Sequence, residues 1–287
     1  MKFAIATSDR YLPVWEAFEE QGWQPVKLFT CPVDHRLHHN QATLERALAR
    51  GLEAQISPMR DQDLAALAQL GCTTLIVASY SWRVPAWRSH LAHAVNFHPS
   101  ALPVGRGAYP IVPAILEQHA DWGVSCHQIE HRFDAGAILA QRRFALAEDE
   151  CHESLDLKLQ WHTRHLATTV AAEFDRLWST ATPQAEGDGH WRAHWTDADR
   201  VLDWQQSVSA VLRKVRAFGP IECVATVNGV TIYVRRATGW REPHDHTPGS
   251  VVQVSQRRLL VAVPDGFVGL LEWHLTPAGV PNSAGDR

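Results

Sequence analysis

The stretch NFHPSALPVGRG, residues 96–107, places an amide and an imidazole two residues apart where a strand ends and a loop begins. The apolar run LAHAV, residues 91–95, precedes it and is typical of a buried strand. Prolines and glycines then interrupt regular structure. Because ligands of open α/β sheets bind beyond the carboxyl ends of the strands, Asn96 and His98 occupy a position where a functional site is expected.

Strand and helix patterns alternate on both sides of this stretch. We expect strands at residues 2–7, 24–30, 73–79, 93–97, 123–129 and 137–146, and helices at 11–22, 41–51, 61–71 and 153–178. Strands that alternate with helices of this length are typical of a parallel sheet. Residues 1–180 are therefore predicted to form an α/β domain with a Rossmann-like, mostly parallel sheet.

The composition changes after residue 180. Residues 181–192 are polar and contain Gly and Pro, which predicts a linker. Beyond it we expect one amphipathic helix at 207–218 and strands at 223–227, 230–237, 250–255, 258–263 and 267–275. Hairpin signals separate these strands, Asn-Gly at 228–229 and Pro-Asp-Gly at 264–266. Residues 193–287 are therefore predicted to form a small β-rich barrel or sandwich.

The composition argues against several classes of protein. The net charge of −4 provides no strongly basic field for nucleic acid. The five cysteines form no CxxC pair, so neither a zinc site nor a disulfide framework is predicted, and we expect no metal. The start of the chain, MKFAIATSDR, is too short and polar for a signal peptide, and no apolar run approaches the ~20 residues of a membrane span. These features predict a cytoplasmic protein without a membrane partner.

A third polar side chain, Asp134, lies in EHRFDAG, residues 130–136, between two later strands. Each of the three residues alone has an ordinary structural explanation, because Asn and Asp favour turns and the chain has 17 histidines. Together they form a chemical set. Asn96 can donate a hydrogen bond to a developing oxyanion, His98 can move a proton near neutral pH, and Asp134 can orient the imidazole. This set suits acyl transfer from one nitrogen to another without a Ser or Cys nucleophile.

Residues 95–139 resemble the signature of the N10-formyltetrahydrofolate-dependent formyltransferases. That pattern is Asn-x-His-Pro-Ser-x-Leu-Pro, then Arg-Gly, then Gly-Val-(Thr/Ser)-x-His, then Asp-x-Gly. The matching residues are Asn96, His98, Pro99, Ser100, Leu102, Pro103, Arg106, Gly107, Gly123, Ser125, His127, Asp134 and Gly136. The resemblance implies that N10-formyltetrahydrofolate is the formyl donor and that Asn96, His98 and Asp134 are catalytic. Ser125 and His127 are expected to support the loop.

The resemblance also implies a binding site for the folate. YSWRVP, residues 80–85, stands where the family has an apolar turn that receives the pterin ring. The expected lining is the backbone around Ser81, Trp82 and Arg83. The loop that closes the other side is expected to contribute Glu130, His131 and Phe133.

Residues 197–220 are similar to the start of the C-terminal domain of methionyl-tRNA formyltransferases, which implies an OB-like domain over residues 193–287. The matching residues are Asp203, Trp204, Val215, Arg216, Ala217, Phe218 and Pro220. Relatives that formylate nucleotide sugars carry the same kind of domain, so this similarity leaves the acceptor open.

Two departures from the tRNA-acting members favour a small amine acceptor. The first strand is followed by ATSDR instead of a Gly-Thr-Pro turn, and Val-Gly precedes Arg106-Gly107 where an aromatic residue is usual. The candidate acceptors are an amino sugar nucleotide, a hydroxyornithine-like compound and an antibiotic precursor.

Methionyl-tRNA formyltransferase is the alternative. The acidic net charge fits poorly to a partner held by phosphate contacts, yet basic residues gather in the second domain. They are Arg213, Lys214, Arg216, Arg235 and Arg236. A formyltetrahydrofolate hydrolase and a non-catalytic folate-binding protein are weaker alternatives. The sequence leaves open whether the protein is a monomer or a homodimer.

Overall fold

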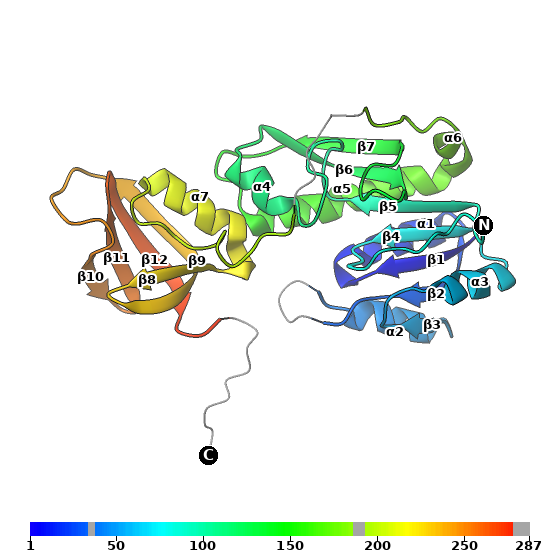
Figure 1. Ribbon diagram of the computed structural model, residues 1–287, viewed down its shortest axis with the longest axis horizontal. Coiled ribbons are helices and arrows are strands. Elements are labelled where there is room, and N and C mark those ends of the chain that lie inside the picture. Colours follow the sequence, from blue (N-terminus) through cyan, green and yellow to red (C-terminus); the bar gives the residue numbers. More distant parts are fainter. Residues whose placement is uncertain (34–37, 186–192, 278–287) are drawn as a thin grey trace, which may run out of the picture. The chain divides into compact units, whose positions relative to one another are not determined.

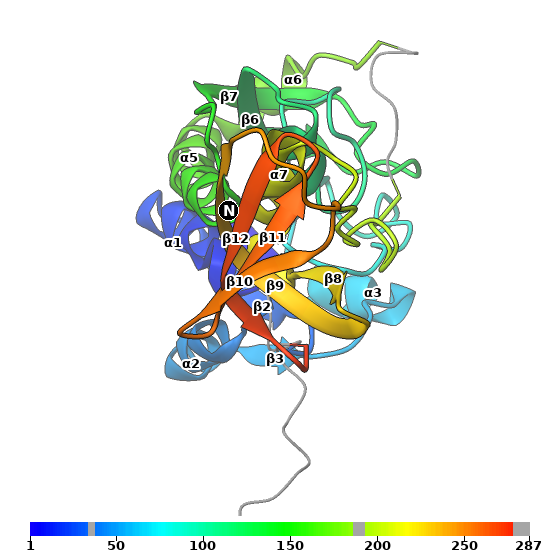
Figure 2. The same ribbon diagram turned by 90° about the vertical axis from the view of Figure 1, so that its left-hand side faces the viewer.

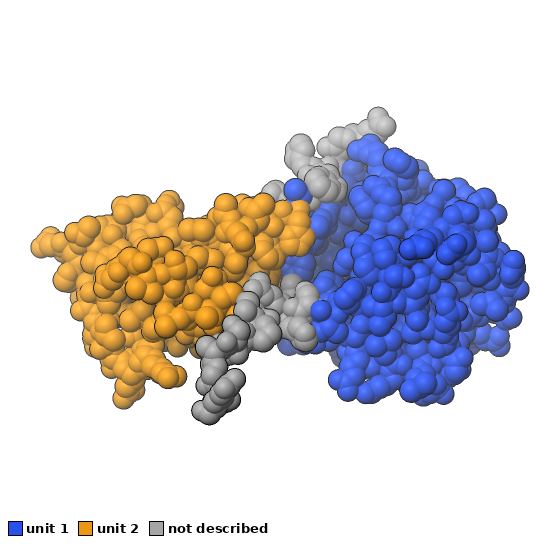
Figure 3. All heavy atoms as spheres, turned by 60° about the horizontal axis from the view of Figure 1, so that its bottom comes forward, with its two compact units in different colours: residues 1–110, 121–145, 156–193 blue, residues 111–120, 146–155, 194–287 orange. Residues whose placement is uncertain are grey.

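The computed structural model describes residues 1–33, 38–185 and 193–277. Two compact units share the chain, shown in separate colours in Figure 3. The larger unit contains Met1–Pro110, Asp121–Ala145 and Asp156–Ala193, and the smaller contains Ile111–Ala120, Leu146–Leu155 and His194–Arg287. The chain therefore passes from the larger unit to the smaller unit after residues 110, 145 and 193, and it returns after residues 120 and 155. Most of the linker predicted at 181–192 lies outside the described residues.

The larger unit is built on a seven-stranded sheet, drawn in Figure 1. Its strands are β1 (Lys2–Thr7), β2 (Gln24–Phe29), β3 (Glu53–Gln55), β4 (Thr74–Ala78), β5 (His93–His98), β6 (Asp121–Gln128) and β7 (Ile138–Ala145), in the order β3-β2-β1-β4-β5-β6-β7. The first five in this order are parallel, whereas β6 is antiparallel to both β5 and β7. The predicted α/β fold with a mostly parallel sheet is confirmed.

Continuous apolar runs explain why the central strands formed where the sequence indicated. All five residues of β4 and the last five of β1 are buried, as expected for strands of a parallel sheet covered on both faces. The short edge strand β3 was not predicted. Its three residues, Glu-Ala-Gln, are largely exposed and carry no apolar pattern.

The helices of the larger unit are α1 (Leu12–Glu20), α2 (Gln41–Ala49), α3 (Asp61–Gln69), most of α5 (His152–Ala172) and α6 (Phe174–Ser179). The single helix predicted over 153–178 is instead two helices, because Glu173 leaves the helical conformation with φ −120° and ψ 24°. After this break Phe174 packs edge-on to Trp23 with ring centroids 5.0 Å apart, and Trp178 packs against His93 at 4.7 Å. Aromatic packing thus outweighs the local helical pattern.

The smaller unit contains one five-stranded antiparallel sheet. Its strands are β8 (Cys223–Val227), β9 (Val230–Arg241), β10 (Val251–Ser255), β11 (Arg258–Val263) and β12 (Gly266–His274), in the order β10-β11-β12-β9-β8. Helix α7 (Val208–Phe218) packs against β9 and β12, as Figure 2 shows. The predicted helix, the five strands and the β-rich character are confirmed.

One short helix of the smaller unit, α4 (Ile111–Leu116), was not predicted. Its six residues are too few to show a helical period, and Pro113 interrupts the pattern. The helix packs against α7. None of the described helices is long and apolar enough to span a membrane.

Candidate functional site

The register of β5 brings its two polar residues to one place. Asn96 and His98 are separated by two positions, so their side chains lie on the same face of the strand. On the neighbouring antiparallel strand β6, His127 stands directly opposite Asn96. The Asn96 Nδ2 atom lies 3.2 Å from His127 Nε2. Strand pairing thus places an amide and two imidazoles together at the end of β5.

The His98 ring is fixed by the loop that follows it. Its Nε2 atom lies 2.8 Å from the carbonyl oxygen of Gly105. Because a carbonyl only accepts, this nitrogen carries a hydrogen and donates it. The other ring nitrogen, Nδ1, lies 3.5 Å from Asp134 Oδ1. Nδ1 is therefore the atom through which His98 can gain or lose a proton.

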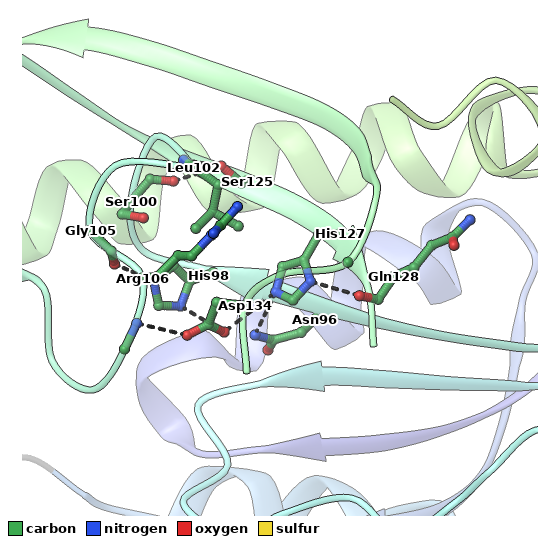
Figure 4. Close-up of polar contacts among 12 residues, drawn as sticks. Asn96, His98, Ser100, Leu102, Gly105, Arg106, Ser125, His127, Gln128 and Asp134 are labelled. Atoms are coloured by element: carbon green, nitrogen blue, oxygen red, sulfur yellow. Dashed lines mark hydrogen bonds and ion pairs between the residues drawn. The ribbon is translucent and has the colours of Figure 1, made fainter. Parts of the chain in front are cut away.

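Asp134 completes the cluster, and Figure 4 shows its carboxylate beside the rings of His98 and His127. Oδ2 accepts a hydrogen bond from the backbone N–H of Gly107 at 2.9 Å. Oδ1 lies 3.6 Å from Nε2 of His127, in addition to its contact with His98. The backbone of Asp134 is left-handed, with φ +54°. This conformation costs non-glycine residues about 1–2 kcal/mol, less for Asp than for most, so surrounding contacts must hold it.

His127 determines how the Asn96 amide is oriented. Its Nδ1 atom lies 2.8 Å from the carbonyl oxygen of Gln128 and therefore donates a hydrogen there. In the neutral ring Nε2 is then an acceptor, and it takes one N–H of Asn96. The second N–H of the amide stays available for another acceptor. His127 thus contacts Asn96 through one ring nitrogen and the backbone through the other.

The loop after β5 is held by side chains that the sequence only partly indicated. Ser125 Oγ donates to the Ser100 carbonyl at 2.6 Å and accepts from the Leu102 N–H at 3.0 Å. Gln141, which was not predicted, donates to Ser125 Oγ at 2.9 Å. Gly105 is required here because its φ is +73° and a Cβ would lie 2.9 Å from Ser100 Cβ. These contacts fix the carbonyl that holds His98.

Burial and neighbouring charges determine the protonation states of Asp134 and His98. Burial alone would raise the pKa of Asp134, but the His98 and His127 rings in their protonated forms and the Gly107 N–H outweigh it and hold this pKa well below its usual value. Burial lowers the pKa of His98 more than the Asp134 carboxylate and the Gly105 carbonyl raise it. At neutral pH the pair is therefore an ionised carboxylate beside a neutral imidazole.

The lowered pKa of His98 predicts a pH dependence of stability. Between the folded pKa and about 6.5, the unfolded chain binds more protons than the folded protein, so the free energy of unfolding falls as pH decreases through this window. His98→Gln keeps a donor for Gly105 but does not titrate. Urea unfolding at a series of pH values is expected to give a shallower slope for the variant. Equal slopes for both proteins contradict the assignment.

The segments expected to bind the pterin also lie together. Arg83 Nη1 donates to the His131 carbonyl at 2.7 Å, and the guanidinium lies 4.2 Å from the centre of the Phe133 ring. Glu130 forms an ion pair with Arg88. The Ser81 N–H donates to Cys31 Sγ at 3.3 Å, and Trp82 packs edge-on to Tyr80. The two segments therefore form one joined surface.

One polar residue of the site falls inside the predicted linker. Gln184 donates hydrogen bonds to the backbone of the Asp134–Gly136 turn and accepts from Arg106. It lies 50 residues from Asp134 in a polar stretch, so no local pattern indicates its role. Within residues 1–33, 38–185 and 193–277, no group of three or more His, Cys, Asp or Glu side chains could hold a metal ion.

Comparison with known families gives two matches that together cover most of the chain. Residues 12–170 match the model described as "Formyl transferase". Residues 195–278 match the model described as "Formyl transferase, C-terminal domain". The first match alone spans more than half of the 287 residues.

Two methionyl-tRNA formyltransferases are among the curated relatives. The protein of Burkholderia pseudomallei (strain 668) is 31% identical over 210 residues, which are 71% of this chain and 64% of the relative. The protein of Coxiella burnetii (strain RSA 331 / Henzerling II) is 24% identical over 290 residues, covering 100% of this chain and 89% of the relative. The match to the Burkholderia protein therefore leaves about a third of that relative uncovered.

Two solved structures share the fold. An N-formyltransferase from Helicobacter canadensis, in complex with folinic acid and dTDP-3-aminofucose, has a TM-score of 0.69 at 13% identity and covers 95% of this chain and 99% of its own. HypX from Aquifex aeolicus, in complex with tetrahydrofolic acid, has a TM-score of 0.63 at 20% identity. That likeness covers 94% of this chain but 43% of HypX. At these identities the likeness is one of fold.

Proposed function

Because this chain belongs to the formyl transferase family, we propose that it transfers a formyl group from N10-formyltetrahydrofolate to the amine of a small acceptor. The observation that carries the proposal is the cluster of Asn96, His98 and Asp134 at the end of β5, held by the contacts described above. Each of the three supplies a different function that formyl transfer between two nitrogens needs.

The surface around residues 80–85 and 130–134 suits the folate donor. It combines a half-buried indole, Trp82, with the exposed ring of Phe133 and with loop backbone between β4 and β5. Aromatic faces suit a flat heterocycle, and backbone N–H and C=O groups of an irregular loop can pair with the polar edge of a pterin. Ser81, Trp82, Arg83, Glu130, His131 and Phe133 are the proposed donor-binding residues.

The reaction forms a bond between the acceptor nitrogen and the formyl carbon and breaks the bond from that carbon to N10 of the donor. One proton leaves the acceptor nitrogen and one is gained by N10. The N–H of Asn96 that His127 leaves available donates to the formyl oxygen as negative charge develops on it. Because His127 fixes the amide, this donor needs no reorganisation during the reaction.

His98 moves the proton. Its ring is neutral near pH 7, so Nδ1 can accept the proton that the acceptor amine loses. The ionised Asp134 carboxylate, 3.5 Å away, stabilises the imidazolium that forms. The same nitrogen then returns the proton to N10, directly or through a water molecule.

The charges of the smaller unit favour a small acceptor over a tRNA. Three of its basic side chains have local partners: Arg216 binds the Glu150 carbonyl, Lys214 binds the Val201 carbonyl, and Arg236 pairs with Glu272. Arg213 and Arg241 line a pocket that also contains Glu148 and Asp149. These partners and the carboxylates of the pocket reduce the positive charge that these side chains offer to phosphates.

Methionyl-tRNA formyltransferase is the second candidate, favoured by the relatives identified from sequence. The Coxiella protein of that name aligns along the whole of this chain. A tRNA acceptor predicts that activity falls steeply with salt, because phosphate contacts release counterions. A small amine acceptor predicts a much weaker dependence on salt.

The test is formyl transfer from N10-formyltetrahydrofolate, followed by the appearance of tetrahydrofolate, with two acceptor pools. One pool is methionyl-tRNA, and the other contains nucleotide-linked amino sugars and hydroxylated diamino acids. Turnover with the second pool alone supports the proposal. Turnover with methionyl-tRNA alone replaces it with the second candidate. Formate release without acceptor indicates a hydrolase, and folate binding without turnover indicates a binding protein.

A further inference from the structure

Gln184 connects the two loops that carry the polar cluster. It follows an isolated bridge in which Thr182 exchanges backbone hydrogen bonds with Ile138, at 2.8 and 2.9 Å. This bridge fixes the path of the chain next to β7. The half-buried side chain of Gln184 then extends toward the turn that contains Asp134.

The two ends of the Gln184 amide bind different loops. Its Nε2 atom donates to the carbonyl oxygens of Asp134, at 2.9 Å, and Gly136, at 2.7 Å. Its Oε1 atom accepts from Arg106, at 2.9 Å from Nε and 2.6 Å from Nη2. Both hydrogens and the oxygen of the amide are therefore used, and only a carboxamide provides this combination.

The turn that Gln184 binds is one that needs support. Asp134 is held at φ +54°, outside the conformations that its own backbone prefers. Gly136 approaches the backbone so closely that a Cβ would lie 1.8 Å from the Gln128 carbonyl oxygen. The position of the Asp134 carboxylate depends on this turn, and the Gly107 N–H that it accepts from belongs to the loop of Arg106.

We propose that Gln184 is a positioning residue: it holds the Asp134–Gly136 turn against the Arg106–Gly107 loop, so that the Asp134 carboxylate stays beside His98. The hydrogen bonds of its amide go to Asp134, Gly136 and Arg106, so its effect on His98 passes through Asp134. The consequence for turnover rests on the proposed function, whereas the consequence for the His98–Asp134 geometry does not.

Two variants test the donor end and the acceptor end of the Gln184 amide separately. Gln184→Ala removes all four hydrogen bonds, while Gln184→Glu keeps an acceptor for Arg106 but loses both donors to the turn. Both are expected to lower kcat by about 10²-fold with a smaller change in KM, as for a misplaced catalytic group. The matched control is Thr182→Ala, because its backbone bridge remains, and it is expected to keep the wild-type kcat. Full activity of Gln184→Glu overturns the proposal.

A double-mutant cycle tests whether Gln184 acts through Asp134. In an Asp134→Asn background, Gln184→Ala is expected to lower kcat by much less than it does alone, since coupled residues are not additive. If Gln184→Ala lowers kcat by the same factor in both backgrounds, Gln184 does not act through Asp134, and the proposal is overturned. Melting temperatures of all variants show whether a loss of kcat reflects unfolding.

A measurement without substrates distinguishes failure of this inference from failure of the proposed function. In protein labelled with ¹⁵N-histidine, the ring resonances of His98 and His127 are assigned by single substitution of each residue. Gln184→Ala is expected to shift both sets, because both rings contact Asp134 Oδ1. Unchanged resonances overturn the inference even if the wild-type enzyme turns over. Shifted resonances support it even if no formyl transfer is found.

Discussion

Asn96→Ala is expected to lower kcat by a factor of about 10²–10³ while the melting temperature changes little, because it removes the proposed oxyanion donor. Asn96→Asp is expected to be at least as impaired, since a carboxylate of the same size offers no N–H and repels the developing charge. Single-turnover rates with saturating donor give the comparison, because they exclude effects on product release.

The control for this substitution is Asn228→Gly. Asn228 lies in the turn between β8 and β9 at φ +49°, a conformation that glycine accepts, so an amide is removed from the smaller unit without strain. Its rate is expected to match the wild type. A rate for Asn96→Ala within a few-fold of the wild type shows that the oxyanion is stabilised by another group.

Asp134→Asn is expected to reduce kcat by about 10²–10⁴-fold, the range attributed to positioned acid–base groups. The substitution preserves size, yet it removes the charge that stabilises the His98 imidazolium. It also offers Gly107 a neutral acceptor in place of a carboxylate. Binding of the folate donor, measured by calorimetry, is expected to change far less than the rate.

The pH profile of this variant provides a second readout. Asp134 raises the pKa of His98 against the larger effect of burial, so its neutralisation lowers that pKa further. His98 must be neutral to accept a proton. The acidic limb of the kcat profile is therefore expected to move to lower pH, measured with an acceptor whose amine is neutral throughout. A limb that stays in place, or moves to higher pH, argues against His98 as the base.

Much of the candidate site could be predicted because its residues stand next to strong local patterns. Asn96 and His98 lie at the end of a buried strand, and Asp134 lies in a turn between two strands. The same holds for β1 and β4, whose apolar runs are long enough to identify. In each case the sequence signal comes from the residue's own segment, although Asn96 and His98 make their side-chain contacts with His127 and Asp134 of later segments.

The features that could not be predicted from the sequence depend on contacts between residues that are far apart along the chain. Gln141 and Gln184 bind backbone carbonyls 39 and 50 residues away, and such contacts require no particular residue type at the other end. The break at Glu173 depends on aromatic rings of other elements. The stacking of Arg83 on Phe133 likewise follows from the meeting of two loops.

The interleaving of the two units limits how this protein can be treated as a set of modules. A cut after residue 193 would leave α4 on the N-terminal fragment, although α4 packs against α7 in the smaller unit. Helix α4, whose Ile111, Val112 and Ile115 side chains are buried, would lose that partner, and the fragment from His194 onward would expose the part of α7 that packs against α4. Exchange of acceptor preference between relatives by swapping C-terminal halves therefore requires that residues 111–120 and 146–155 travel with the half that they complete.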